Sequence, residues 1–183
     1  KREAMKPIDT AQYGPVLHAI VAASHAPVLF APGDGEMPGL ITNGHWLIAV
    51  PSNITEWKGT EPAAGGDRGA ERARNMRQMA TDAAVRGNDL VIVGAAVEPD
   101  RADRVQDLHQ PIILKWRQRG KHNAVSLHSL TLADGDFKTA IDPVYYAAAL
   151  AMDCQLRRSG GALDPIGLVL DEAVVGLVMP MRI

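Results

Sequence analysis

The first fifty residues combine one helical pattern with several short apolar runs. Apolar side chains recur every three to four positions across residues 8–25, which predicts a helix. Apolar runs at 28–31, 40–42 and 46–50 predict strands. Asn43-Gly44 lies between the last two runs, and this pair favours a type I′ turn, so we expect a hairpin there.

The middle of the chain begins with residues 51–66, which are rich in Pro, Gly, Thr and Ala and predict a loop or linker. A helix is expected to follow, with Asp67 as its N-cap and Gly87 as its stop. Met76, Met79 and three alanines give this helix an apolar stripe. We therefore expect it to pack one face against a sheet.

The second half of the chain is predicted to contain further strands and one more helix. The apolar residues 89–93 are typical of a buried strand, and the polar residues 96–110 of a loop. Asp142-Pro143 predicts the start of a helix, because Asp is a favoured N-cap and Pro a favoured first residue. Apolar or alternating runs predict five more strands, at 111–116, 124–132, 137–141, 165–170 and 174–179.

The order of these elements indicates an internal repeat. Helix, strand and hairpin follow one another over residues 8–50, and strand, helix and paired strands over 137–181. Hairpins of neighbouring strands, interrupted by helices, are typical of an α+β fold with antiparallel sheet. Aromatic residues are only 4% of the chain, so aliphatic side chains and alanine must form the core.

The last residues carry a specific motif. The chain ends in Val178-Met179-Pro180-Met181-Arg182-Ile183, and Phe137 to Tyr146, followed by Leu150, joins a strand to a helix. The ending resembles the terminal Met-Pro-Met-Arg-Leu/Ile of the bacterial DNA sliding clamp, the beta subunit of the replicative DNA polymerase. The strand-to-helix segment is also similar to the last such segment of that family. The resemblance covers roughly residues 137–183.

This resemblance implies a clamp-like α+β fold, in which antiparallel sheets and packed helices form rings around DNA. It also implies self-association into a homo-oligomer and an apolar pocket near the C-terminus that binds peptides of DNA polymerases or repair proteins. By resemblance, this partner-peptide pocket consists of Asp142, Tyr145, Met179, Pro180 and Met181. The chemistry is reasonable on its own, because flexible methionines accept varied apolar side chains.

The domain organisation that follows has three parts. Residues 1–52 are expected to form one clamp-like half-unit and residues 125–183 the C-terminal half-unit. Residues 53–124 are expected to be an insertion that carries the arginine-rich helix. The chain resembles the family in only one region, so the insertion has no assigned role.

Positive charge is local, since the formal net charge is −2. Basic clusters can contact a DNA backbone without sequence preference, although a charge run is more often a solvated surface, and both interpretations stay open. The candidate DNA-binding residues are Arg68, Arg72, Arg74, Arg77, Lys115, Arg117, Arg119, Arg157 and Arg158. The last two are placed at the end of the helix that begins at Pro143.

No recognised catalytic or metal-binding motif is present. The six histidines lack the spacing of a metal site, and Cys154, the single cysteine, follows an apolar stretch where a buried thiol is expected. No apolar run approaches the length that spans a bilayer, so we expect a cytoplasmic protein without membrane association. No catalytic residue, metal or cofactor is predicted.

The sequence therefore favours a non-enzymatic replication and processivity factor of the sliding-clamp kind. Two alternatives stay open. The chain could be a clamp-derived protein-interaction module that does not bind DNA, or an unrelated small α+β enzyme. Oligomeric state and salt-dependent retention on DNA separate these hypotheses.

Overall fold

The computed structural model describes residues 4–24, 26–97 and 127–182. The strand predicted at 111–116 and most of the loop predicted at 96–110 lie outside these residues. So do the first residues of the strand predicted at 124–132.

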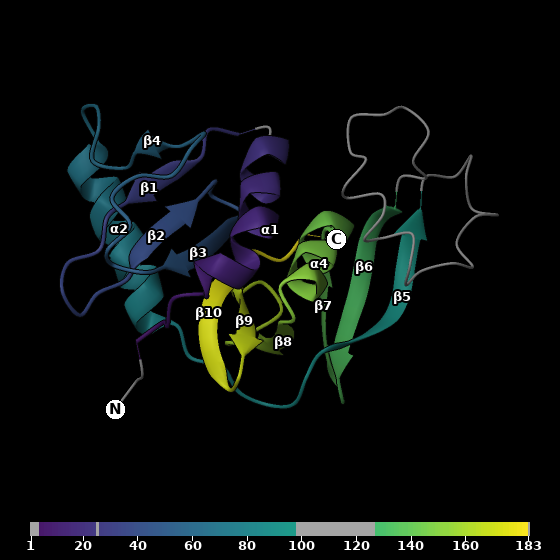
Figure 1. Cartoon of the computed structure of the whole chain (residues 1–183). Coiled ribbons are helices and arrows are strands. Elements are labelled where there is room, and N and C mark those ends of the chain that lie inside the picture. The colour runs from purple at the N-terminus through teal and green to yellow at the C-terminus, as the bar shows by residue number, and fades with distance from the viewer. Residues whose placement is uncertain (1–3, 25, 98–126, 183) are drawn as a thin grey trace.

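Three helices and ten strands form the described part of the chain (Figure 1). The helices are α1 (Thr10–Ala23), α2 (Gly69–Asp82) and α4 (Pro143–Ala151). The strands are β1 (Leu29–Ala31), β2 (Gly39–Thr42), β3 (Trp46–Val50), β4 (Glu61–Pro62), β5 (Val91–Val97), β6 (Leu127–Asp134), β7 (Phe137–Ile141), β8 (Gln155–Arg158), β9 (Ile166–Leu170) and β10 (Ala173–Val178).

Two sheets organise these strands. The larger sheet has seven strands in the order β4-β1-β2-β3-β10-β9-β8, and the smaller sheet has the order β5-β6-β7. Neighbouring strands are antiparallel except β1 and β4, which pair in parallel. The predicted α+β class with antiparallel sheet is therefore confirmed.

The larger sheet contains a repeat that differs from the expected one, because the strand expected at 137–141 is β7 of the smaller sheet and β8 takes its place. Helix α1 is followed by the meander β1-β2-β3, and α4 by the meander β8-β9-β10. The last strands of the two meanders, β3 and β10, pair antiparallel at the centre of the sheet. The two helices also contact each other. The Tyr13 hydroxyl of α1 donates a hydrogen bond to Asp153, just after α4, at 3.0 Å. The halves at the two ends of the chain thus share one sheet and one core.

Both faces of the larger sheet are covered, which explains why every residue of β2 and β3 is buried. One core lies toward α1 and α4 and includes Ile41 and Ile48. The other lies toward α2 and includes Leu40 and Leu47. This division follows from the alternation of side chains along a strand. The sheet therefore separates α2 from α1 and α4, as Figure 1 shows.

Two helices begin at an aspartate N-cap, and the cap at Asp142 was predicted from the sequence. The Asp9 carboxylate accepts hydrogen bonds from the backbone N–H groups of Ala11 at 3.0 Å and Gln12 at 3.4 Å. Asp142 accepts one from the N–H of Val144 at 2.8 Å, and Pro143 opens α4. These contacts satisfy donors that have no partner within the helix.

The bounds of α2 differ from the prediction. The helix begins at Gly69 rather than directly after Asp67, its N-cap is Arg68, and no side chain caps it. Gly69 is required by packing, because an added Cβ would lie 2.2 Å from the carbonyl group of Ala64. The helix ends at Asp82, well before Gly87, because Ala83 adopts an extended conformation. After the helix the chain passes beside the end of β8, where the Arg86 N–H donates a hydrogen bond to the Arg158 carbonyl at 2.9 Å.

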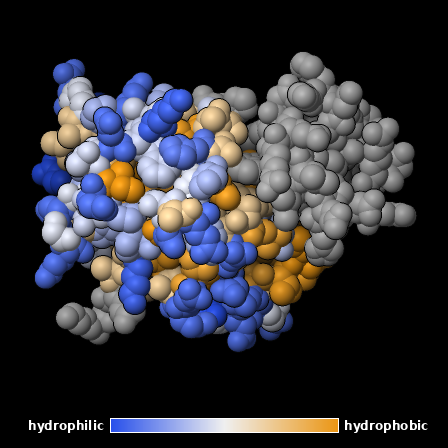
Figure 2. All heavy atoms as spheres, viewed as in Figure 1, coloured by the Kyte–Doolittle hydropathy of each residue, from blue (hydrophilic) through white to orange (hydrophobic). Residues whose placement is uncertain are grey.

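Two further expectations were wrong. The segment 89–93 was predicted to be a buried strand. Its last three residues are the start of β5, and there Val91 is 57% exposed and Val93 is 54% exposed. Only Ile92 of the three packs against the core, because the smaller sheet turns one face toward it. An apolar area lies over this part of the molecule in Figure 2. The helix α4 ends at Ala151, so Arg157 and Arg158 lie on β8 and not at a helix end.

Candidate functional site

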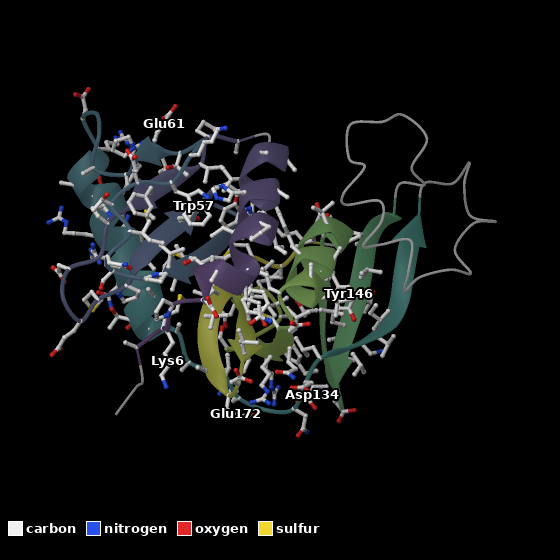
Figure 3. The ribbon with its side chains drawn as sticks, viewed as in Figure 1. Lys6, Trp57, Glu61, Asp134, Tyr146 and Glu172 are labelled. Carbon is white, nitrogen blue, oxygen red and sulfur yellow. The ribbon has the colours of Figure 1, made fainter. Side chains whose placement is uncertain are left out.

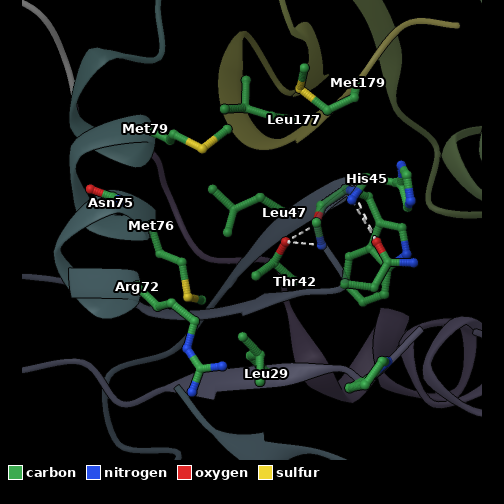
Figure 4. Close-up of a pocket in the computed structure, with 14 residues that line it drawn as sticks. Leu29, Thr42, His45, Leu47, Arg72, Asn75, Met76, Met79, Leu177 and Met179 are labelled. Carbon is green, nitrogen blue, oxygen red and sulfur yellow. Dashed lines mark hydrogen bonds between the residues drawn. The ribbon is translucent and has the colours of Figure 1, made fainter. Parts of the chain in front are cut away.

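A pocket of about 260 Å³ lies between α2 and the larger sheet (Figure 4). Three separate stretches of the chain form it: the β1 to β3 region, the helix α2, and the end of β10. Its lining residues are Pro27, Leu29, Thr42, Asn43, Gly44, His45, Trp46, Leu47, Arg72, Asn75, Met76, Met79, Leu177 and Met179.

The helix α2 supplies one wall. Arg72, Asn75, Met76 and Met79 are spaced three, four and seven positions apart, so they share one face of the helix. Met76 is 6% exposed and packs against the sheet, whereas Met79 is 40% exposed. Met76 therefore forms the floor beside the core, and Met79 forms part of the opening.

The turn between β2 and β3 supplies a second wall, and its geometry differs from the expected type I′ turn. Among Asn43 and Gly44, only Gly44 has a positive φ, of 90°. The Asn43 side chain instead accepts hydrogen bonds from the backbone N–H groups of His45 at 2.9 Å and Trp46 at 3.2 Å. The Thr42 hydroxyl accepts one from the Gly44 N–H at 3.0 Å and donates to the Trp46 carbonyl. These side-chain contacts hold the turn in one conformation.

The end of β10 supplies the third wall, with Leu177 and Met179. Leu177 is buried in the core under α2, and its strand pairs with β3 through Leu47. The Met179 N–H donates to the His45 carbonyl at 2.8 Å. This bond places the C-terminal segment beside the β2–β3 turn, so two of the walls are joined directly.

Charge is unevenly distributed around the pocket. Arg72 is the sole Lys or Arg side chain among the lining residues, and no carboxylate lines it. Its guanidinium donates to the Gly65 carbonyl, which fixes it at the edge of the pocket. In Figure 4, Arg72 lies at the same end as Leu29, whereas Met79 lies toward Leu177 and Met179. The pocket is thus apolar with a cation at one end.

Of the residues expected to form a partner-peptide pocket, Met179 lines this one, and the other four are not among its lining residues. Asp142 caps α4, and Tyr145 is partly buried against the main core. The Met181 N–H donates to the Ala140 carbonyl of β7 at 2.9 Å. Beyond Met179 the chain, with Pro180, therefore leaves the pocket and crosses to the smaller sheet.

Sequence reasoning did not connect α2 or the β2–β3 turn with the C-terminal motif. A signal for α2 was present, because the apolar stripe with Met76 and Met79 indicated a packed face. Which surface that face would meet depends on contacts between residues far apart in the sequence. No local pattern reveals these contacts.

The candidate DNA-binding residues fall into separate places. Arg68, the N-cap of α2, and Arg74 of α2 are exposed. Arg72 lines the pocket, and Arg77 donates to the carbonyl of Pro32. Three further candidates, Lys115, Arg117 and Arg119, lie outside the described residues. Neither α1 nor α4 contains a lysine or an arginine.

The two arginines of β8 have intramolecular partners. Arg157 forms an ion pair with Asp89 at 2.9 Å and a two-pronged contact with Glu172 at 3.0 and 3.1 Å. Glu172 lies at the turn between β9 and β10 (Figure 3). The side-chain hydrogen bonds to Glu172 and Asp89 raise the pKa of Arg157, and the same contact lowers the pKa of Glu172. The guanidinium of Arg158 lies 4.9 Å from the centre of the Phe137 ring.

Other chemistry has little support within the described ranges. Cys154 is buried, and desolvation raises the pKa of its thiol to about 12, which suppresses the reactive thiolate. No group of three His, Cys, Asp or Glu side chains that could hold a metal occurs in the described part of the chain. His18 stacks instead on Trp57, with ring centres 4.3 Å apart. Among the described helices, none is both long and apolar enough to cross a bilayer.

No protein-family model, curated protein or solved structure matches this chain.

Proposed function

We propose that this protein is a peptide-docking module whose pocket beneath α2 binds a large apolar side chain of a partner protein. The observation that carries the proposal is the pocket itself, with walls from α2, the β2–β3 turn and β10. An apolar cavity of about 150 Å³ can hold a benzene-sized group. The present volume of about 260 Å³ therefore accepts one large side chain and part of a second.

The nature of the walls also favours a peptide. Met76, Met79 and Met179 line the pocket, and methionine side chains adapt to anchors of different shape. The pocket opens at the partly exposed Met79, so a segment of another chain can lie across α2 while its anchor enters. Apolar anchors that enter such pockets supply most of the binding energy of peptide complexes.

We further propose that the module is clamp-like. Two features support this proposal: the C-terminal motif over residues 137–183, and the repeated order of helix and three-stranded meander in one sheet. In this proposal the chain self-associates and serves DNA replication as a processivity accessory. Light scattering over a range of protein concentrations would test it, because a ring requires one discrete oligomer and a strict monomer is incompatible with a self-assembled ring.

Non-specific DNA contact is a second candidate function, and the exposed Arg68 and Arg74 at the first turns of α2 favour it. The helices α1 and α4 carry no lysine or arginine, so they do not provide the positive surface of a DNA-lined hole. We expect retention on a duplex DNA column that weakens steeply with salt and is reduced in an R68Q/R74Q variant. Equal retention of variant and wild type would remove α2 from the DNA hypothesis.

The docking proposal is tested by filling the pocket. Fluorescence polarization would measure the binding of labelled nonapeptides that carry Leu-Phe on a Ser/Gly background, with both termini capped. Asn75→Trp places an indole at the pocket on an exposed helix position, and we expect it to abolish binding. Gln78→Trp adds the same ring to an exposed α2 position outside the lining and should bind normally. Similar binding by both variants would contradict the proposed site.

A further inference from the structure

The cation at one end of the pocket indicates what kind of peptide it accepts. Resting on the docking function proposed above, we propose that the partner segment is acidic, with a carboxylate that pairs with Arg72 while an apolar anchor lies between Met79 and Met179. An apolar cleft with a single cation favours a ligand that is apolar at one end and anionic at the other. The proposal makes Arg72 a residue that determines specificity.

The guanidinium of Arg72 is prepared for this role by its contact with the loop before α2. One of its nitrogens donates to the Gly65 carbonyl, which restricts the side chain at the edge of the pocket. A guanidinium has five N–H donors in a fixed plane, so others stay available for a carboxylate. Since no Asp or Glu side chain lines the pocket, a carboxylate of a bound peptide would not compete with an acidic lining residue for Arg72.

The helix sets the spacing between the two recognised groups. Arg72 and Met79 are separated by two turns of α2, a distance of about 10 Å at 1.5 Å rise per residue. An extended peptide advances about 3.3 Å per residue. The carboxylate and the apolar anchor should therefore be two to four residues apart in the partner sequence.

A nucleic acid could also supply an anion to Arg72, but the pocket favours a peptide. Its floor consists of Leu47, Met76 and Leu177, which are buried and aliphatic or thioether in character. Bases bind proteins chiefly by stacking on aromatic side chains and need further cations along the backbone. Trp46 is the single aromatic ring of the lining apart from His45, and it is 4% exposed, so it offers almost no free face.

The test uses pairs of capped nonapeptides that differ only by Asp or Asn, with the acid placed two, three or four residues from a Leu-Phe anchor. Fluorescence polarization would compare them on wild type, Arg72→Gln and Arg74→Gln. Arg74 is a matched control, because it is an exposed arginine of the same helix outside the lining. For wild type and R74Q we expect the Asp peptides to bind about threefold to fivefold tighter than the Asn peptides, the range of a partly exposed ion pair. For R72Q this preference should disappear, so that the Asp and Asn peptides of each pair bind equally.

The outcomes separate the two proposals. If wild type binds both peptides of each pair equally, or if R72Q retains the preference, the acidic-partner inference is overturned and the docking function stands. If wild type binds none of the peptides, the docking function fails and the inference with it. If a capped peptide shows no preference but single-stranded oligothymidylate binds in an Arg72-dependent manner, the ligand is a nucleic acid and the inference is overturned. Thermal unfolding of both variants at the wild-type temperature would confirm that they are folded.

Discussion

Replacing the two methionines of α2 by alanine, one at a time, separates packing from ligand binding. Met76 is 6% exposed and belongs to the core between α2 and the sheet. Met79, three residues later on the same face, is 40% exposed and lines the pocket. Both variants lose the same atoms in the same helix, so differences between them report the environment of each side chain.

The magnitudes follow from these exposures. Met76→Ala should lower the free energy of unfolding by about 2–3 kcal/mol, at the low end for buried methionine because the adjacent pocket lets neighbours relax. Met79→Ala should cost only about 1 kcal/mol, since much of the side chain already faces water. Full burial of a methionine contributes about 1.5–3 kcal/mol, so covering the exposed 40% of Met79 with a peptide contributes about 0.6–1.2 kcal/mol. Its loss should weaken peptide binding about threefold to eightfold.

Two measurements check this pair. Urea unfolding followed by far-UV circular dichroism gives the stabilities, and fluorescence polarization with the Leu-Phe nonapeptide gives the affinities. Met79→Leu is the control, because it restores an apolar side chain of similar volume and should recover most of the affinity. The reasoning is refuted if Met79→Ala destabilises the fold as much as Met76→Ala does and leaves peptide affinity unchanged.

Three further predictions concern the scaffold. Asp9→Ala should lower the free energy of unfolding by about 1 kcal/mol, because α1 loses its N-cap, and a urea titration would show a lower midpoint. Gly167→Ala should lower the free energy of unfolding by about 1–3 kcal/mol, since the added Cβ would lie 2.2 Å from a methyl of Val85. A second change, Val85→Ala, should recover part of this stability, whereas purely additive losses in the double variant would contradict the clash. The thiol of Cys154 should react with iodoacetamide far more slowly in the folded than in the urea-unfolded protein. Because burial raises the pKa of this thiol from 9.0 to about 12, the stability that it contributes is fully present below pH 9 and is lost as the pH rises toward 12. Equal labelling rates of the folded and the unfolded protein at pH 9 would refute the burial.

Elements defined by local chemistry were predicted well from the sequence. The hairpin β2–β3 was expected from two apolar runs around Asn43-Gly44, and α4 from Asp142-Pro143, and both are present. In each case the determining groups lie within a few residues of each other. The internal repeat was expected with the strand at 137–141 as a member, but the second meander is β8-β9-β10 and that strand pairs with β6 in the smaller sheet.

The errors occur where distant contacts override local preference. Asp67 is a better capping residue than Arg68, yet α2 begins at Gly69, which fits against Ala64 as no larger residue could. The chain after α4 was expected to remain helical as far as Arg158, but Leu156 is buried as part of β8 and the strand pairs with β9. The two candidate DNA-binding arginines of that strand consequently face Asp89, Glu172 and Phe137.

The candidate pocket could not be assembled from the sequence for the same reason. Met179 was named from the C-terminal motif, but a pocket also needs its opposite wall, and that wall is a face of α2 about a hundred residues earlier in the chain. A stripe of apolar residues shows that a helix is packed without showing against what. The hydrogen bond from Met179 to His45, which brings the turn to the C-terminal segment, is likewise a contact between distant residues.

The three walls of the pocket differ in how strongly packing constrains their residues, and this difference affects which peptides the pocket selects. Leu47 and Leu177 belong to the core of the sheet, so their identity is constrained by packing, whatever the ligand. Arg72, Asn75 and Met79 are exposed residues of a helix within the segment that shows no resemblance to the clamp family, and the fold constrains them less. Exposed positions can change at little cost in stability. In the proposed docking function, the sheet and the C-terminal segment therefore provide a fixed geometry for an apolar anchor, whereas α2 provides the charge and shape that distinguish one partner peptide from another.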